Sequence, residues 1–381
     1  MQYKDLAWFC PEPFTSLETT TDGHGMVCCW SSISTPDNIQ SSFIDGLYNS
    51  NTLIEIRKSI LENKTPQTCK ILQKYCNICF TQEHNGVESW RKHKTKSMDY
   101  ELDNLTAYIP LEKAPIKSIK LRIFGITCNL KCLMCSEDRS SKIAAELGKY
   151  NSDQFNIWSK LNKQLLYADL IKIMPSVTSI KFTSGEPFLS EDISEFFQWL
   201  LDNGFNHLQI TISTNGTVQN DNFVSQLNKF KKTRLHFSID GVNNLDEYIR
   251  HGTKWNNKIE TIKYWQSNLI NAEHICWTTV QALNVVNIQE ISNFCIESNL
   301  IQEFHLLTGP RFLSLETLPM ELKQKYSEII PEYFCDIHTE LKKESNHQKK
   351  LWNQFVRYIN LKDMIRNQSI FSVRPEMQAY F

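Results

Sequence analysis

The chain has 381 residues, a length typical of two or three domains, and 41% of them are hydrophobic, which is enough to form a sizeable core. Its 41 Lys and Arg residues balance 42 Asp and Glu residues, and this formal net charge of −1 argues against a dedicated nucleic-acid binder. No apolar stretch approaches the ~18 residues of a membrane helix, and the amino terminus lacks a secretory-signal pattern, so we expect a cytoplasmic protein.

The first segment, residues 1–105, contains six of the twelve cysteines of the chain. In a reducing compartment, cysteines indicate metal binding or catalysis more often than disulfides. The C-x2-C pair of Cys76 and Cys79, with two more distant cysteines, would make an ordinary four-thiolate metal set, and ligand type alone does not separate iron–sulfur from zinc. We therefore predict a small domain that is stapled by metal rather than by core burial.

Residues 116–315 alternate between strand-like and helix-like patterns. The strands are predicted at residues 118–126, 177–183, 207–214, 234–240, 274–282 and 303–308. The helices between them are predicted at residues 192–201, 222–230, 258–269 and 287–298. This alternation predicts a parallel sheet of right-handed βαβ units, with its chemistry at the carboxyl ends of the strands.

The first predicted strand runs into three cysteines with the spacing C-x3-C-x2-C, namely Cys128, Cys132 and Cys135. Three thiolates within eight residues can wrap one cubane cluster, and soft thiolates select iron–sulfur clusters, zinc or Cu(I). A structural zinc site usually has four protein ligands, whereas the nearest other Cys or His lies more than thirty residues away. A cubane held by three thiolates leaves one iron open for a ligand from outside the protein. A zinc knuckle is the alternative interpretation.

The chain continues after residue 315 with a predicted helical extension, residues 316–381. Its helices are expected at residues 321–340, interrupted at Pro331, and at residues 350–365. The three remaining cysteines stand singly in strand-like or helix-like runs, so we interpret Cys276, Cys295 and Cys335 as core residues.

The three-cysteine loop resembles the signature of the radical S-adenosylmethionine (SAM) superfamily. In that family the open iron of a [4Fe–4S] cluster chelates SAM. One electron cleaves SAM into methionine and a 5′-deoxyadenosyl radical, which abstracts a hydrogen atom from the substrate. The resemblance implies an α/β fold, a partial (β/α)6 TIM-like barrel over residues 116–315, between a small cysteine-rich cluster domain and the helical extension. It also implies an electron donor such as flavodoxin or ferredoxin.

Other strand ends resemble the SAM-binding segments of the family. Residues 184–187, Ser-Gly-Glu-Pro, match the family's Gly-Gly-Glu-Pro with Ser for the first Gly, and would bind the SAM amino group. Residues 213–215 would contact the ribose and the carboxylate, and residues 238–240 the SAM pocket or the substrate. Arg250 would pair bidentately with the SAM carboxylate, with a solvated helix-end Arg as the alternative. The implied cofactor-binding residues are Ser184, Gly185, Glu186, Ser213, Asn215, Ser238, Asp240 and Arg250.

The amino-terminal cysteines resemble a SPASM or twitch auxiliary-cluster domain, in the branch where this domain precedes the core. The match covers Phe9 to Arg91, with Phe14 for the usual Trp and an apparent insertion around residues 69–75. The resemblance implies a second iron–sulfur cluster, also [4Fe–4S], with a zinc ribbon as the alternative. The expected ligands are Cys10, Cys29, Cys76 and Cys79, while Cys28 and Cys69 are further candidates.

The resemblance implies an oxidoreductase that modifies a peptide or protein side chain by hydrogen abstraction, because members with auxiliary clusters often act on peptides. The same radical chemistry on a small molecule, such as a sugar or a cofactor precursor, is the alternative. A zinc-stabilised binding protein without catalysis is a third hypothesis. No single residue is assigned as the catalytic acid, base or radical quencher.

Overall fold

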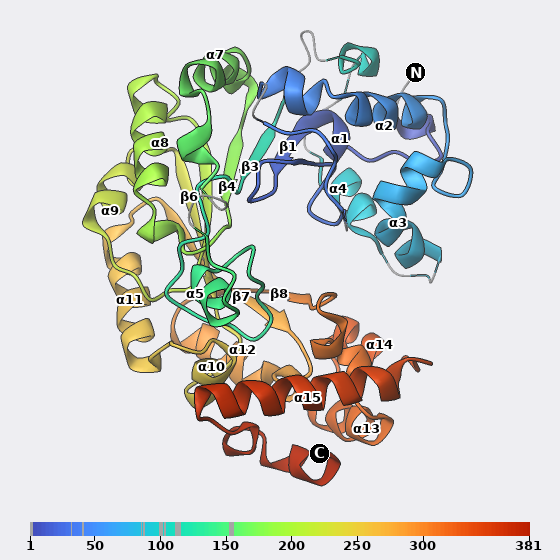
Figure 1. Cartoon of the computed structure of the whole chain (residues 1–381), viewed down its shortest axis with the longest axis vertical. Helices are drawn as coiled ribbons and strands as arrows, with labels where there is room; N and C mark the ends of the chain where they lie inside the picture. The colour runs from blue at the N-terminus through green and yellow to red at the C-terminus, as the bar shows by residue number, and fades with distance from the viewer. Residues whose placement is uncertain are drawn as a thin grey trace. The chain divides into compact units, whose positions relative to one another are not determined.

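The computed structural model describes residues 3–31, 33–39, 42–84, 86, 88–98, 102, 104–110, 116–151 and 156–381. Its contacts divide the chain into two compact units, and Figure 1 labels the elements of both. The first unit comprises Met1–Thr127, Asn151–Ile212 and Ser225–Thr233. The second unit comprises Cys128–Tyr150, Ser213–Val224 and Arg234–Phe381.

The strands form an eight-stranded sheet in the order β2-β1-β3-β4-β5-β6-β7-β8. They are β1 (Ser16–Thr19), β2 (Gly25–Met26), β3 (Ser118–Leu121), β4 (Ser179–Phe182), β5 (Gln209–Thr214), β6 (Lys232–Ser238), β7 (Ala272–Val280) and β8 (Ile301–Leu306). The pairs β1–β3, β3–β4, β4–β5 and β7–β8 are parallel, and β1–β2 is antiparallel. A mostly parallel sheet in a mixed α/β fold is consistent with a partial TIM barrel, so the predicted fold class is confirmed.

The six predicted strands are present as β3 to β8, and the structure adds β1 and β2 from the amino-terminal segment. These two strands have four and two residues, too few for a period-two pattern to be recognised. Strand β3 is shorter than predicted because the backbone N–H of Arg122 donates to the hydroxyl of Thr19 at 3.0 Å instead of continuing the ladder.

Helices precede, separate and follow the strands. The first are α1 (Glu12–Thr15), α2 (Asn51–Leu61), α3 (Lys70–His84) and α4 (Trp90–Lys96). The next are α5 (Ser141–Glu146), α7 (Lys163–Ile173), α8 (Glu191–Asp202), α9 (Asp221–Leu227), α10 (Asn244–Ile249), α11 (Trp255–Asn268) and α12 (Ile288–Glu297). The last are α13 (Met320–Ile329), α14 (Cys335–Leu341) and α15 (Gln348–Arg366), so the predicted interruption at Pro331 is confirmed. Within the described ranges, no helix combines the length and the apolar character that crossing a membrane requires.

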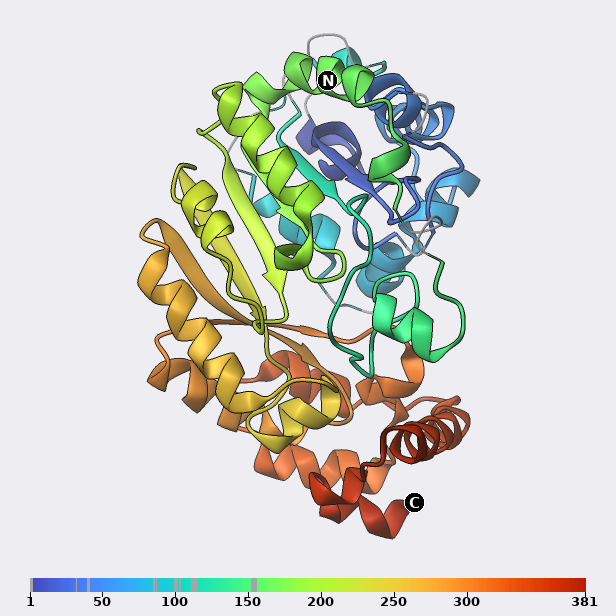
Figure 2. The ribbon, with the colours of Figure 1, turned by 60° about the vertical axis from the view of Figure 1, so that its left-hand side comes forward.

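In the first unit, one face of the strands is apolar and the other is charged. Figure 2 shows α8 lying along the sheet, and the ring of Phe182 contacts those of Phe196 and Phe197 with centroids 6.2 and 5.0 Å apart. Because side chains alternate along a strand, Lys181 projects from the opposite face. The strand register aligns Lys181 with Lys120 and Lys120 with Glu18.

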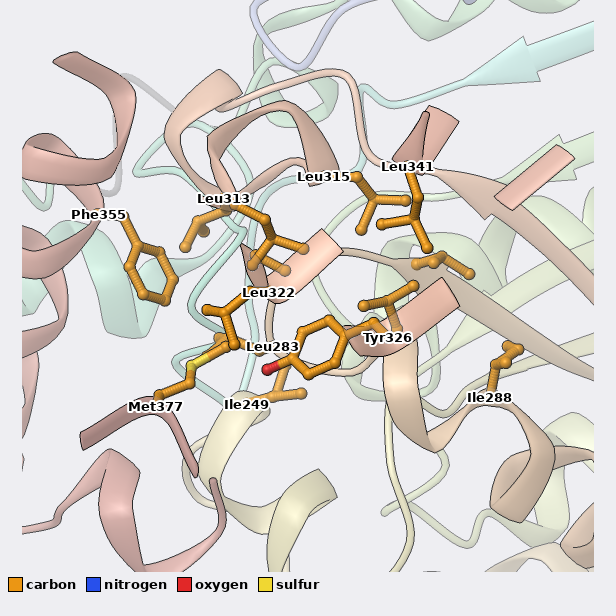
Figure 3. Packing of buried hydrophobic residues seen from close by; sticks show 14 of the residues in the cluster. Ile249, Leu283, Ile288, Leu313, Leu315, Leu322, Tyr326, Leu341, Phe355 and Met377 are labelled. Atoms are coloured by element: carbon orange, nitrogen blue, oxygen red, sulfur yellow. The ribbon is translucent and has the colours of Figure 1, made fainter. Parts of the chain in front are cut away.

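In the second unit, the last helices and the carboxyl-terminal tail share one hydrophobic core (Figure 3). Leu322 and Tyr326 of α13, Leu341 of α14 and Phe355 of α15 are at most 1% exposed, and Met377 of the tail is fully buried among them. The tail is therefore part of the core, and this packing fixes α15, whose polar residues reach the three-cysteine loop.

Candidate active site

The three-cysteine loop is fixed by backbone hydrogen bonds to the end of α10. The N–H of Leu133 donates to the carbonyl of Ile249 at 2.8 Å, and the N–H of Lys131 donates to the carbonyl of His251 at 2.9 Å. At its start, the N–H of Cys128 donates to the hydroxyl of Ser141 at 3.1 Å. The loop is thus held by a bond to a side chain at its start and by two main-chain bonds further along, and none of these bonds involves a cysteine sulfur.

Cys128, Cys132 and Cys135 form no disulfide, and the first two lie close enough to Cys135 to act electrostatically on its thiol. Burial raises the pKa of Cys135 to about 12, and the neighbouring Cys132 and Cys128 contribute to that rise. Among the described residues, no three or more His, Cys, Asp and Glu side chains already stand at positions that could hold a metal ion. The donor set nevertheless fits an iron–sulfur cluster, because three soft thiols share one backbone-fixed loop and metal binding deprotonates such thiols.

Arg250 links the loop to the end of β6. Its Nη1 donates to the sulfur of Cys132 at 3.7 Å, and its Nη2 lies 2.7 Å from a carboxylate oxygen of Asp240. Cys132 is 9% exposed, Arg250 8% and Asp240 0%, so water is largely excluded from this contact. Burial lowers the pKa of Arg250, but Asp240 outweighs it and the net pKa is raised, so the guanidinium is charged.

Asp240 is held by groups from β7, from α10 and from the loop after β7. Its Oδ1 accepts from the N–H of Thr279 at 2.7 Å, and its own N–H donates to Asp246 at 3.0 Å. The side-chain amide of Asn284 donates to the carbonyl of Asp240 at 2.9 Å. Asp246 in turn pairs with the fully buried Lys258 at 2.7 Å. The structure thus brings the predicted residues Asp240 and Arg250 together with Cys132.

The predicted residue Asn215 also reaches the cysteine loop. Its side-chain amide donates to the carbonyl oxygen of the Asn129 side chain at 2.8 Å, and Asn129 donates to the hydroxyl of Thr217 at 2.8 Å. Ser213, at the end of β5, is half-buried. Ser238, at the end of β6, accepts a hydrogen bond from Lys258 Nζ on its backbone carbonyl at 2.8 Å.

A clamp between α5 and α15 secures the loop from the carboxyl-terminal side. Glu146 is paired with Lys131 of the loop at 3.1 Å, with Arg366 at 3.1 Å, and with Lys362. The hydroxyl of Tyr358 donates to the carbonyl of Leu133 at 2.7 Å. Burial raises the pKa of Glu146, but hydrogen bonds from Arg366 and Lys362 outweigh it and lower the pKa to about 2. No local sequence pattern predicts this clamp, because its α15 partners lie more than 200 residues from Glu146.

In the first unit, the Ser184–Glu186 turn is bonded to the segment that enters the cysteine loop. The hydroxyl of Ser184 donates to the carbonyl of Gly125 at 3.0 Å, and the N–H of Glu186 donates to that of Thr127 at 2.7 Å. Gly185 has φ +55°, and a Cβ there would lie 2.3 Å from the carbonyl oxygen of Thr127. Glycine is therefore required at this predicted site residue by close backbone approach and by its left-handed conformation.

The amino-terminal cysteines differ in which neighbours act on their thiols. Burial raises the pKa of Cys76 to about 12 with help from Cys79, and burial with Cys10 raises that of Cys28. Cys29 differs, because the groups with the largest effect on its thiol, apart from burial, are Lys120 and Glu18. The sulfur of Cys69 lies 3.5 Å from the hydroxyl of Ser59. Cys10, Cys28, Cys76 and Cys79 therefore influence one another, while Cys29 acts on Cys28 and Cys69 acts on Cys76.

Glu83, Ser89 and Arg91 of the matched amino-terminal motif tie the C-x2-C helix to the first cysteine. Arg91 donates to both oxygens of Glu83, at 2.9 and 2.5 Å, and to the carbonyl of Phe9 at 2.7 Å. Ser89 donates to the same carboxylate. The guanidinium also lies 4.2 Å from the ring centroid of Trp8. This network holds α3 and α4 against the segment that carries Cys10.

Comparison with known proteins matches residues 123–295 to the family model of the radical SAM superfamily. The chain is 24% identical to a probable GTP 3′,8-cyclase of Methanothermobacter thermautotrophicus. The aligned 227 residues cover 58% of this chain and 64% of that protein. It is 26% identical to the 7,8-dihydro-6-hydroxymethylpterin dimethyltransferase of Methanocaldococcus jannaschii. The aligned 126 residues cover 33% of this chain and 22% of that protein. The chain thus spans less than two thirds of these curated relatives.

Among solved structures, the chain is similar to Streptococcus suis SuiB bound to its precursor peptide SuiA. The match has 16% identity and a TM-score of 0.35, and it covers 95% of this chain and 73% of that one.

Replacing Gly185 with Ala will destabilise the protein more than the same change at Gly204. Both glycines have positive φ, +55° and +76°, so backbone strain in either alanine variant lowers the free energy of unfolding by about 1 kcal/mol. A Cβ at 204 meets nothing within 4 Å, whereas the one at 185 overlaps the carbonyl of Thr127. The clash adds about 1–3 kcal/mol, measurable by urea unfolding. Equal losses for both variants would contradict the packing described for this turn.

Replacing Glu146 with Gln will remove a pH-dependent part of the stability. The pKa of Glu146 falls from its ordinary value of 4.5 to about 2 in the folded protein, so its contribution is complete above pH 4.5. It is lost as the pH decreases toward 2. Thermal unfolding should show Glu146→Gln less stable than wild type at pH 7, with the difference shrinking below pH 4.5. Glu297→Gln, an exposed change on α12, is the control and should follow wild type throughout.

Proposed function

We propose, because residues 123–295 match the family model of the radical SAM superfamily, that the chain reductively cleaves SAM and abstracts a hydrogen atom from a peptide or protein side chain. The observation that carries the proposal is the loop of Cys128, Cys132 and Cys135, three cysteines outside any disulfide on a loop whose Lys131 and Leu133 are bonded through the backbone to residues 251 and 249. When bound there, a [4Fe–4S] cluster supplies the electron that cleaves SAM into methionine and a 5′-deoxyadenosyl radical.

The residues of this chain would position the cofactor and keep water away from it. Leu130 and Leu133 are each 1% exposed, so buried apolar side chains of the loop stand next to its cysteines in sequence. The carboxylate of Glu186, 1% exposed, suits the positively charged amino group of SAM. We keep as proposed SAM-binding residues the set Ser184, Gly185, Glu186, Ser213, Asn215, Ser238 and Asp240, whereas Arg250 contacts Cys132 and Asp240 and is considered separately below.

We further propose an auxiliary iron–sulfur cluster on Cys10, Cys28, Cys76 and Cys79, in a domain of residues 1–105. The shared neighbourhood of these thiols supports Cys28 as the fourth ligand in place of Cys29, which the sequence alone had favoured. Four protein thiolates would leave no iron open, and this favours electron relay or a structural role over substrate binding. The core and the helical extension then span residues 116–315 and 316–381.

The second candidate is the same chemistry on a small molecule. It is favoured by the two curated relatives, whose names describe a GTP cyclase and a pterin dimethyltransferase. Gene neighbourhood separates the two candidates: a short open reading frame for a peptide beside this gene supports the first, and sugar or cofactor genes support the second. Anaerobically purified protein that contains zinc and no iron would instead support the non-catalytic binding protein.

Replacing Cys128, Cys132 and Cys135 together with Ala will abolish SAM cleavage, because these thiolates would bind the other three irons and so hold the cluster that carries the open iron. The measurement is 5′-deoxyadenosine formed by anaerobically reconstituted protein with dithionite or reduced flavodoxin as electron donor. Cys335 is exposed on α14, so its interpretation as a core residue was wrong, whereas Cys276 and Cys295 are buried as expected. Cys335→Ala is therefore the control and should retain the wild-type rate. Persistent 5′-deoxyadenosine in the triple variant would refute the assignment.

Replacing Cys76 and Cys79 together with Ala will lower the iron content by about four atoms per chain while the cluster on the core loop remains. The pair Cys28→Ala and Cys29→Ala then tests the fourth ligand. Cys28→Ala should lower auxiliary iron, and Cys29→Ala should leave it unchanged. The opposite result restores Cys29 as the ligand, and unchanged iron in the Cys76, Cys79 double variant removes the auxiliary cluster from the proposal.

A further inference from the structure

Arg250 touches a sulfur of the core cysteine loop through a guanidinium that is already oriented. Its Nη1 lies 3.7 Å from the sulfur of Cys132, and its Nη2 lies 2.7 Å from Asp240. The backbone N–H of Arg250 donates to the carbonyl of Asp246 at 2.8 Å. The side chain is therefore anchored at its root and at one of its terminal nitrogens, which leaves the other aimed at the sulfur.

The orientation of the guanidinium depends on Asp240. One oxygen of this carboxylate accepts from the N–H of Thr279 at 2.7 Å, so the other is the one that holds Arg250. Asp240 is fully buried, and its N–H is bonded to Asp246, which pairs with Lys258 at 2.7 Å. The contacts of Asp240 with β7 and α10, and the salt bridge between Asp246 and Lys258, thus fix the position of Arg250 without any bound ligand.

A cation that donates to a cluster thiolate stabilises the reduced form of the cluster, which carries one more negative charge than the oxidised form. Hydrogen bonds to the sulfurs and nearby charge are among the factors that set the potentials of iron–sulfur clusters. The effect is large when water is excluded, because a buried charge is weakly screened. Cys132, 9% exposed, and Arg250, 8% exposed, meet this condition.

We propose that Arg250, oriented by Asp240, is a positioning residue that raises the reduction potential of the cluster on Cys128, Cys132 and Cys135. The inference rests on the proposed function. It differs from the role expected from the sequence, a bidentate pair with the SAM carboxylate, because that pair would require at least one terminal nitrogen to leave Asp240 or Cys132. The step concerned is the uptake of one electron by the oxidised cluster from an external donor, with no bond made or broken.

The experiment is a redox titration of the anaerobically reconstituted full chain, with dithionite as reductant and electron paramagnetic resonance of the reduced core cluster as readout. It is performed in the Cys76→Ala, Cys79→Ala background, without SAM and then with SAM.

Arg250→Gln removes the charge and the donor, and Arg250→Lys keeps the charge alone. At the wild-type midpoint potential, Arg250→Gln should lower the ratio of reduced to oxidised cluster about tenfold, or about 59 mV for one electron. Arg250→Lys should give a smaller shift in the same direction.

Arg374→Gln is the matched control. Arg374 is 1% exposed and is paired with Glu376 in the second unit, and it donates to Leu283 and Tyr326 without touching a loop cysteine. This variant should keep the wild-type potential even if its melting temperature decreases. If Arg250→Gln does not fold, Arg250→Lys alone decides, since an unchanged potential in that variant counts against a fixed donor geometry.

An unchanged potential in Arg250→Gln without SAM would overturn the inference. So would a shift that appears only when SAM is present, accompanied by a raised Kd for SAM, since that result assigns Arg250 to the SAM carboxylate. Absence of any reduced [4Fe–4S] signal from the wild-type core would instead be a failure of the proposed function. The two failures are therefore distinguishable.

Discussion

The Asp240 carboxylate is fully buried, and a buried charge destabilises a fold unless it is paired and hydrogen-bonded. Here both oxygens are used, one by the N–H of Thr279 and one by the guanidinium of Arg250. These bonds join the ends of β6 and β7 to the end of α10, the helix end that also holds the cysteine loop through residues 249 and 251. Loss of the Asp240 contacts would leave Arg250 as an unpaired buried charge beside Cys132, so the order of the second-unit site depends on this carboxylate.

The carboxyl-terminal helix is a structural part of the site and not an appendage. Glu146 gathers Lys131 from the loop with Lys362 and Arg366 from α15, and Tyr358 of α15 bonds the loop carbonyl at residue 133. Because α15 is itself seated in a core with α13, α14 and the tail, packing far from the cysteines is transmitted to the loop by short, directional contacts. Truncating the extension would therefore disturb the site without removing any candidate ligand.

The strands of each unit also carry polar or charged side chains. In the first unit, Glu18 is 3.0 Å from Lys120 and 2.8 Å from Arg122. Burial, with Lys120 nearby, lowers the pKa of Lys181 to about 8. In the second unit, the ring of Trp277 lies 5.0 Å from that of His236 and 5.2 Å from that of His305. Each unit therefore presents hydrogen-bonding or charged groups from the side of its strands that carries no apolar core.

Local sequence was sufficient for the features that depend on neighbours in the chain. The cysteine spacing, the alternation of strands and helices, and the Ser184–Glu186 turn at the end of β4 are all short-range patterns, and they predicted the fold class and most candidate site residues. Cys132, Arg250 and Asp240 were each recognised separately, as was the pair Cys28 and Cys29. Tertiary structure alone decided that Arg250 contacts Cys132 across 118 residues, that Glu146 holds α15, and which thiols are neighbours. The physical reason is that side-chain pairing depends on which strand ends and helices meet in space, and residue spacing carries no record of contacts made between distant segments.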